Sequence, residues 1–477
     1  MKTLMKPLAI AIMLALLALA TPPLACCSST EHIDLAEYWA PVWYQDTDST
    51  DYDAEYITRF DFDGNWLGSD NWENQPFYPL PAYIYYWVVE TETNWFIGYA
   101  DFHPRDWTDF PLIDTQHEND LEGCVLVIQR DGSEHGQFLL MITIAHWNFL
   151  SYKDFDSLPS GNVTSGTHSI TGDVEFYDGH HPYLYVESEG HGVYGDQRWE
   201  DSDFPGGDGV VYYYTGVAEE PSGGNDRDVG YALESIDELW EMRYPDEHPD
   251  TWYAYGTFEG DITPGVVAMT ANAADAPWGW DDWNDGDAFE SDLFMDPAYI
   301  VDYYHDGLGD FSHTYVSRSY SGVLESFHPY RSDFHRTWAW RVPGADEVRV
   351  HFTSIETEAD DDTITFLDGN GTQVGEAVSG EHTDYWSPWV AGDTIQVRLD
   401  SDGDSNRGWG FSADVFETLP APGDANGDGD INMQDVTYTE LIILGYMETT
   451  PGADANSDSD VNMGDVTTIE LMILGYL

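Results

Sequence analysis

A sequence repeat occurs twice near the C-terminal end of this chain, beginning at Asp424 and again at Asp454. Each copy is a loop rich in Asp and Asn that runs into an apolar segment ending in Leu-Gly-Tyr. Side-chain oxygens recur at the first, third, fifth, ninth and twelfth loop positions, the spacing that wraps a hard cation, and the seventh residue offers its backbone carbonyl. These positions are Asp424, Asn426, Asp428, Asp430, Asn432 and Asp435 in the first loop, and Asp454, Asn456, Asp458, Asp460, Asn462 and Asp465 in the second. The spacing predicts two calcium loops.

Each loop is followed by a segment with helical periodicity. The apolar positions are Val436, Thr439, Ile443 and Leu444 in the first copy, and Val466, Ile469, Ile473 and Leu474 in the second. This spacing is that of one helix face. One loop with one helix has too little apolar surface for a core, so we expect the two copies to pack together with metal in place.

Residues 423–477 resemble a type I dockerin, a small calcium-folded domain that docks on a cohesin domain of a partner protein. The resemblance implies two bound Ca²⁺ ions and a cohesin-bearing partner. It places the recognition positions at Met433-Gln434 and Met463-Gly464. The second loop departs from the first at its sixth position, where Ser459 stands in place of Gly429 at the sharp turn.

Acidic residues dominate the composition, with 89 Asp and Glu against 16 Lys and Arg and a net charge of −73. This balance excludes nucleic acid as a partner, because phosphate binding needs clustered basic side chains. Residues 1–27 are typical of a signal sequence, with Lys2 and Lys6 before an apolar run and small residues at its end. We therefore expect an exported protein with no transmembrane span in the mature chain, and Cys26 or Cys27 also permits a lipid anchor.

Residues 31–320 predict a large β-sandwich, because short apolar runs alternate with Gly, Pro, Asn and Asp. In an extended chain alternate residues share a face, so Asp120 and Glu122 should lie together, with His117 nearby. Glu187, Glu189 and His191 repeat this spacing, and His146 could face the same cleft. Oxygen ligands with one His suit Mg²⁺, Ca²⁺ or Mn²⁺, so we predict a divalent metal site of unknown identity.

The His-x-x-Asp-x-Glu pattern at His117 resembles the His-Arg-His-Asp-Trp-Glu core of the necrosis- and ethylene-inducing cytolysins and of related vacuolar-protein-sorting β-sandwich proteins. The resemblance implies four metal ligands, Asp109, His117, Asp120 and Glu122. Asn119 and Leu121 stand where those cytolysins have His and Trp, and membrane lysis does not transfer.

Residues 323–417 predict a second antiparallel sandwich, because apolar and polar residues alternate in 348–352, 363–367 and 395–399. The segment Asp362-Thr-Ile-Thr-Phe-Leu-Asp-Gly369 and the later Ser401-Asp402 resemble a CUB domain with its jelly-roll sandwich. The resemblance implies a calcium site of Glu356 or Glu358 with Asp362 and Asp402. Residues 418–422 form a short linker to the C-terminal repeat.

The chain is therefore expected to be mainly β, with a large sandwich, a CUB-like sandwich and a small helical dockerin, and to attach to a cohesin-bearing partner. One alternative is a metal-dependent or carbohydrate-active hydrolase of polysaccharides, in which His191 or Glu189 moves the proton. Another is a module that binds lipid or glycan headgroups. The aromatic residues Trp278, Trp280, Trp283 and Tyr212–Tyr214 allow either sugar stacking or a sandwich core and rim.

Overall fold

The computed structural model describes residues 29–107, 116–196, 208–262, 274–282, 292–406 and 408–477. The predicted signal sequence, residues 1–27, lies outside these ranges. The chain divides into two compact units. The first unit comprises Ser29–Arg341 with Val348–Glu417, and the second comprises Val342–Glu347 with Thr418–Leu477.

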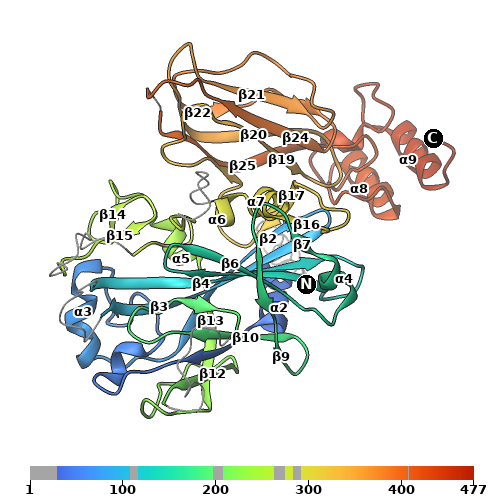
Figure 1. Cartoon of the computed structure of the whole chain (residues 1–477). Helices are drawn as coiled ribbons and strands as arrows, with labels where there is room; N and C mark the ends of the chain where they lie inside the picture. Colours follow the sequence, from blue (N-terminus) through green and yellow to red (C-terminus); the bar gives the residue numbers. More distant parts are fainter. Residues whose placement is uncertain (1–28, 108–115, 197–207, 263–273, 283–291, 407) are drawn as a thin grey trace, which may run out of the picture. The chain divides into compact units, whose positions relative to one another are not determined.

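The first unit is built on a large curled sheet (Figure 1) whose strands run in the order β11-β10-β1-β12-β13-β2-β3-β4-β5-β6-β8. Its strands are β1 (Val42–Gln45), β2 (Tyr83–Thr91), β3 (Asn94–Asp106), β4 (His117–Gln129), β5 (Gln137–Ala145), β6 (Asn148–Lys153), β8 (Ile170–Asp173), β10 (His181–Val186), β11 (Val193–Tyr194), β12 (Val210–Tyr214) and β13 (Val229–Ser235). The mainly β fold expected from the sequence is confirmed.

The pairing of β3 with β4 is the longest in this sheet and runs from Asn94 opposite Gln129 to Asp106 opposite His117. Residues on one face of these strands, including Ile97, Tyr99 and Leu126, enter the main hydrophobic core. The same core takes Trp43 from β1 and Tyr212 from β12, so the curled sheet packs on itself.

Short elements complete this part of the unit. They are α2 (Ser29–Trp39), η1 (Tyr52–Glu55), η2 (Gly68–Asp70), α3 (Asn71–Asn74), η3 (Gln75–Phe77), α4 (Leu158–Asn162), α5 (Asp237–Glu241), α6 (Asp292–Met295), α7 (Pro297–Tyr304), β7 (Thr164–Ser165), β9 (Phe176–Tyr177), β14 (Trp252–Ala254), β15 (Thr257–Phe258) and β16 (His305–Asp306).

Residues 314–420 add a sandwich of two sheets and the strand β17 that joins it to the large sheet. The strands are β17 (Thr314–Arg318), β18 (Leu324–Glu325), β19 (His335–Arg341), β20 (Ala345–Glu356), β21 (Thr363–Asp368), β22 (Glu381–Trp386), β23 (Val390–Ala391), β24 (Thr394–Asp400) and β25 (Gly410–Pro420). One sheet has the order β18-β25-β20-β22, with β23 on β20, and the other contains β19, β24 and β21. β17 pairs with β2 and with β19, so the sandwich and the large sheet are joined by backbone hydrogen bonds.

Buried ion pairs reinforce this junction. Arg243, which follows α5, contacts Glu325 of β18 through Nη2 and Oε2 at 2.8 Å, and His328 reaches the other carboxylate oxygen at 2.8 Å. Arg336 of β19 contacts Asp296, just before α7, at 2.7 Å. All these charged groups are almost fully buried, so the charges must compensate one another.

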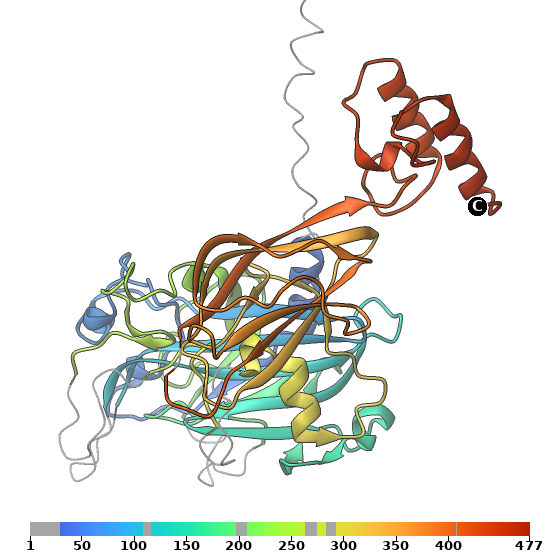
Figure 2. The ribbon, with the colours of Figure 1, turned by 90° about the horizontal axis from the view of Figure 1, so that it is seen from above.

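The second unit contains two helices, α8 (Met433–Ile443) and α9 (Met463–Ile473), and η5 (Pro451–Ala453). Each helix begins with a capping box, from Asn432 with Asp435 and from Asn462 with Asp465. The helices lie side by side (Figure 2) over two small apolar clusters, which include Val436, Val466 and Ile469. In the described part of the chain, no helix is long and apolar enough to cross a membrane.

We predict that acid weakens the first unit through Glu325. Burial alone would raise the pKa of Glu325, but Arg243 and His328 outweigh it and lower the pKa to about 2, from an ordinary value of 4.5. A depressed pKa stabilises the fold above about pH 4.5, and this contribution of a few kcal/mol is lost as the pH falls towards about 2. Urea unfolding followed by tryptophan fluorescence at a series of pH values measures the loss.

The Glu325→Gln variant removes the charge and leaves Arg243 buried without its partner. We expect it to lower the free energy of unfolding by about 3–5 kcal/mol at neutral pH, and to flatten the pH dependence between pH 4.5 and 2. Glu92→Gln is the control, because Glu92 forms a solvent-exposed pair with Arg341. An equal pH dependence in wild type and Glu325→Gln would contradict the prediction.

Candidate functional site

Acidic and histidine side chains gather where β3 and β4 pair at their polar ends. Asp101 of β3 lies directly opposite Glu122 of β4, and His103 lies opposite Asp120. Paired residues in an antiparallel ladder point to the same face. Asp120 and Glu122 therefore share a face, as the alternation predicted, and the register adds Asp101 and His103 to them.

His191 lies at the centre of this cluster and is fully buried. Its Nδ1 is 3.1 Å from Asp120 Oδ2 and its Nε2 is 3.2 Å from Glu55 Oε2. Burial would lower the pKa of His191, but these two carboxylates outweigh it and raise the pKa to about 10. Its ring stacks on His103 at 3.7 Å, and burial together with this neighbouring charge holds the pKa of His103 well below its usual value. The pair thus combines one charged and one neutral imidazole.

The turns beside the strands supply two more members. His146 lies between Glu122, 3.4 Å from Nδ1, and Glu187, 2.5 Å from Nε2. Burial disfavours its charge, but the two carboxylates hold the pKa of His146 well above its usual value. The backbone N–H of His146 donates to Glu122 Oε1 at 2.7 Å, so the turn and the strand hold one another in place.

Backbone strain concentrates around this cluster. Asn119, His146, Glu189 and His191 all have positive φ, between 53° and 68°. Left-handed backbone is unfavourable for residues other than glycine, and it persists where the surrounding contacts fix it. Each of these residues turns a β3, β4, β5 or β10 segment at the cluster, which is a reason to regard it as a functional site.

The structure turns His117 away from the other predicted ligands. Its Nδ1 donates to the carbonyl of Asn119 at 2.9 Å, and its Nε2 is 3.2 Å from Asp106 Oδ2. Burial opposes its charge, but Asp106 outweighs burial and raises the pKa of His117 to about 9. Asp109 lies outside the described residues. Of the four predicted ligands, the structure therefore brings Asp120 and Glu122 to the cluster.

Two carboxylates in the cluster fit a cation. Both oxygens of Asp101 and Oε2 of Glu122 are buried, with no hydrogen-bond partner in the described part of the chain. Burial raises the pKa of both groups. The charge of Glu122 raises the pKa of Asp101 further, whereas His146 opposes the rise in the pKa of Glu122. A divalent cation held by Asp101 and Glu122, with Asp120 adjacent, would compensate this charge. The sequence did not single out Asp101 or Glu55.

The predicted proton-transfer residues occupy fixed positions. Both nitrogens of His191 face carboxylates, as described above, and a charged imidazolium has no lone pair with which to accept a proton. The N–H of Glu189 donates to Glu55 Oε2 at 3.0 Å, and its carbonyl accepts from Trp107 at 3.1 Å. A catalytic role for His191 and Glu189 stays a prediction.

A second acidic group lies in the sandwich of residues 324–420. Carboxylate oxygens of Glu358, Asp402 and Asp404 lie within 4.8 Å of one another. Asp362 is buried beside them, accepting from the hydroxyl of Tyr330 at 2.5 Å and from the N–H of Asp402 at 2.9 Å. Of the two glutamates expected from the sequence, the structure places Glu358 here, whereas Glu356 is exposed on β20.

The two C-terminal loops share a pattern in which backbone N–H groups donate to aspartate carboxylates. In the first loop, carboxylates of Asp424, Asp428 and Asp435 lie within 4.8 Å of one another. Asp424 accepts from the N–H groups of Gly427, Asp428 and Gly429. The second loop repeats this pattern, with Asp454 accepting from Asp458 and Ser459 and Asp465 accepting from Asn456 and Asn462. Asp430 and Asp460, at the seventh positions, have exposed side chains.

A third acidic group was not predicted from the sequence. Oxygens of Glu73, Glu118 and Asp261 lie within 4.8 Å of one another. Burial raises the pKa of Glu118 to about 7. Both of its oxygens accept backbone hydrogen bonds, from Trp72 and Asp261, so this group is explained by local structure.

No protein-family model matches the chain. Among curated proteins, the human E3 ubiquitin-protein ligase HERC2 is 36% identical over 107 residues, 21% of this chain and 2% of that protein. Among solved structures, the CUB1-EGF-CUB2 domains of rat MASP-1 match with 21% identity and a TM-score of 0.17, over 20% of this chain and 39% of that chain. A structure of NLPPya in complex with glucosamine matches with 13% identity and a TM-score of 0.24, over 51% of this chain and 89% of that chain. None of these matches assigns the chain to a family.

We predict that Asp101→Asn or Glu122→Gln removes one divalent ion per chain, because each variant removes a carboxylate charge that the cation would balance. The measurement is elemental mass spectrometry of the full chain after equilibration with Ca²⁺, Mg²⁺ or Mn²⁺ and desalting. Asp131→Asn, in the exposed turn at the other end of β4, is the matched control. Identical metal content in wild type and both variants would contradict the prediction that this cluster binds a cation.

We also predict that the second C-terminal loop is weakened by its serines. Ser457 and Ser459 have φ values of 57° and 74°, where the first loop has Gly427 and Gly429. Left-handed backbone costs a residue with a Cβ about 1 kcal/mol relative to glycine. Ser459→Gly should therefore stabilise the unit by about 1 kcal/mol, read as a higher EDTA concentration at the midpoint of chelation-induced unfolding by circular dichroism.

Gly429→Ser is the matched reverse change. A Cβ at Gly429 would meet only ordinary contacts, at 3.7 Å, so its effect would report backbone conformation rather than a clash. It should shift the same midpoint in the opposite direction. Equal midpoints in wild type, Ser459→Gly and Gly429→Ser would show that the turn conformation does not limit calcium binding.

Proposed function

We propose that this chain is an exported modular protein that attaches to a cohesin-bearing partner through its C-terminal calcium loops, residues 423–477, and carries a metal-binding β-sandwich. The two loops and two helices of this unit support the proposal. The observation that carries the proposal is the duplicated, exposed apolar surface of the two repeats.

Equivalent residues of the two repeats are equally exposed. Met433 and Met463, which begin the two helices, are 58% and 57% exposed, and Tyr446 and Tyr476, after the helices, are both 76% exposed. Leu444 and Leu474 are also exposed to the same extent. Large apolar side chains in solvent are unfavourable unless a partner covers them. Their presence in both repeats supports a binding surface more than chance exposure.

The small cores of the unit support a role for calcium in its folding. The apolar clusters contain few buried side chains, among them Ala425, Ile442 and Ala453 in one, and Val436, Val466 and Ile469 in the other. Asp435 and Asp465 are fully buried at the ends of their loops. Cores this small need a further source of stability, and the binding free energy of two Ca²⁺ ions would supply it.

The cation in the first unit would have a separate role. Asp101 and Glu122 would hold it, Asp120 would sit beside it, and its charge would allow these acidic groups to remain ionised in a buried cluster. The cluster joins β3, β4 and the turn at His191, so the ion would stabilise this end of the sandwich and offer a metal-dependent binding surface.

We predict that calcium-dependent binding to a cohesin requires both exposed methionines. The double variant Met433→Asp with Met463→Asp places a charge at the equivalent position of each repeat. It should weaken binding to a responsive cohesin at least about a hundredfold, because charges would be desolvated in an apolar interface. The measurement is isothermal titration of the full chain with a panel of type I cohesins, in Ca²⁺ and in EDTA.

Val415→Asp is the control, because Val415 is exposed on β25, outside the two repeats. It should bind like wild type, and EDTA should abolish binding by every form of the chain. Absence of binding to the whole panel while circular dichroism shows a calcium-dependent fold would contradict the attachment proposal and leave the calcium loops in place.

A further inference from the structure

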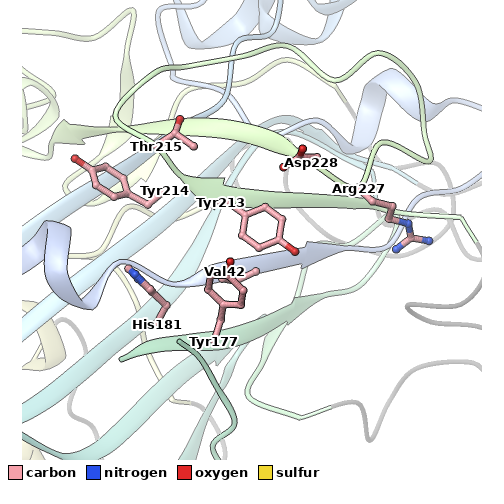
Figure 3. Close-up of a pocket in the computed structure, with 8 residues that line it drawn as sticks. All are labelled: Val42, Tyr177, His181, Tyr213, Tyr214, Thr215, Arg227 and Asp228. Carbon is pink, nitrogen blue, oxygen red and sulfur yellow. The ribbon is translucent and has the colours of Figure 1, made fainter. Parts of the chain in front are cut away.

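A pocket of about 390 Å³ lies on the first unit, over the strands β1, β10 and β12 (Figure 3). Tyr177 and Tyr213 form its centre above Val42, with His181 at one end and Arg227 and Asp228 at the other. Its volume is in the range of sites for small ligands. Of the aromatic residues considered for sugar stacking, Trp278, Trp280 and Tyr212 are buried in the core, whereas Tyr213 and Tyr214 line this pocket. Trp283 lies outside the described residues.

The strand register separates this pocket from the buried histidine cluster. Val42 pairs with Tyr183, and three residues further along β1, Gln45 pairs with Val186 and Val210. Gln45 faces the cluster, since it accepts from His103 at 3.1 Å. Val42 and Gln45 are roughly 10 Å apart along the strand and point to opposite faces. The pocket therefore lies on the other face of the sheet and towards its other end.

The tyrosines offer open ring faces. The rings of Tyr177 and Tyr213 meet edge to face at 63°, with centroids 5.4 Å apart, and Tyr44 and Tyr183 meet in the same manner at 62° and 5.4 Å. In this arrangement the rings do not cover one another. Tyr177 is exposed, and Tyr213, Tyr183 and Tyr44 are half-buried. The result is an aromatic surface that can receive a flat apolar ligand face.

The ends of the pocket supply both donors and acceptors. Arg227 and the tyrosine hydroxyls can donate, and Asp228 can accept. His181 Nδ1 donates to the carbonyl of Ala40 at 2.6 Å, so its Nε2 carries a lone pair. Burial lowers the pKa of His181, which keeps the imidazole neutral at neutral pH. Balanced donors and acceptors around aromatic rings suit a ligand with several hydroxyl groups.

The charge of the chain disfavours an anionic ligand in this pocket. The chain carries a net charge of −73, which disfavours an anion, and Arg227 is the only cationic side chain among those that line the pocket. We propose that this pocket binds a neutral saccharide, with a pyranose ring face on Tyr177 and Tyr213 and ring hydroxyls on Arg227, Asp228 and His181. This binding site is independent of the attachment unit and of the metal cluster.

The test is binding of the full chain to an array of neutral hexose and pentose oligosaccharides, followed by isothermal titration with the strongest binder. Tyr177→Ala with Tyr213→Ala should weaken its binding about tenfold or more, since each ring contributes stacking on the ligand. Tyr177→Phe, which keeps the ring, should bind like wild type. Tyr253→Ala is the control, because Tyr253 is a more exposed tyrosine on β14, outside the pocket.

Saccharide binding should survive EDTA and the Asp101→Asn change, which separates this site from the metal cluster and from cohesin attachment. Circular dichroism of the double variant checks that its fold is retained. Three results would overturn the proposal: no neutral saccharide bound by wild type, equal binding by wild type and the double variant, or tyrosine-dependent binding of choline in place of saccharides.

Discussion

Compensation of buried negative charge is the constraint on which this structure depends. The chain has 16 Lys and Arg residues and 89 Asp and Glu residues, so few buried carboxylates can have a Lys or Arg partner. Where a guanidinium is present it lies at a junction: Arg243 meets Glu325, and Arg336 meets Asp296. Elsewhere histidine takes this place, as His191 does between Asp120 and Glu55. Glu122 lies 3.4 Å from His146, while both oxygens of Asp101 and Oε2 of Glu122 have no hydrogen-bond partner in the described part of the chain, so a cation there would supply further positive charge.

The strength of the local sequence signal decides which strands and helices could be predicted from the sequence. Gln137–Ala145 forms the strand β5 and Pro297–Tyr304 forms the helix α7, as their local sequence alone indicates. Each carries a strong local signal, a continuous apolar run in one and an N-terminal Pro in the other. The apolar run of β4 begins at Cys124, yet the strand begins at His117. Its first residues are polar, so the apolar run that marks the rest of the strand does not include them. Pairing with β3 decides their conformation.

The residues of the candidate site also divide into those indicated by a local pattern and those brought together by pairing of distant segments. Asp120 and Glu122 were found because two residues on one strand obey the alternation of side chains. Asp101, His103 and Glu55 join them through the β3–β4 register and the position of η1, which depend on contacts between segments far apart in the chain. Local spacing grouped His117 with Asp120, and in the structure the ring of His117 contacts Asp106, with the left-handed Asn119 between the two predicted ligands.

The short strand β1 contributes to both sites of the first unit, because its side chains point alternately to the two faces of the sheet. Trp43 and Gln45 face inward, one into the core and the other onto His103, while Val42 and Tyr44 face the tyrosine surface. The inner face is buried, so its polar groups must be satisfied by fixed partners, and the left-handed turns at His146 and His191 provide them. The outer face is partly open, and its tyrosine rings line a pocket that can receive a ligand. One strand of four residues thus separates a rigid charged cluster from a surface that can exchange ligands with solvent.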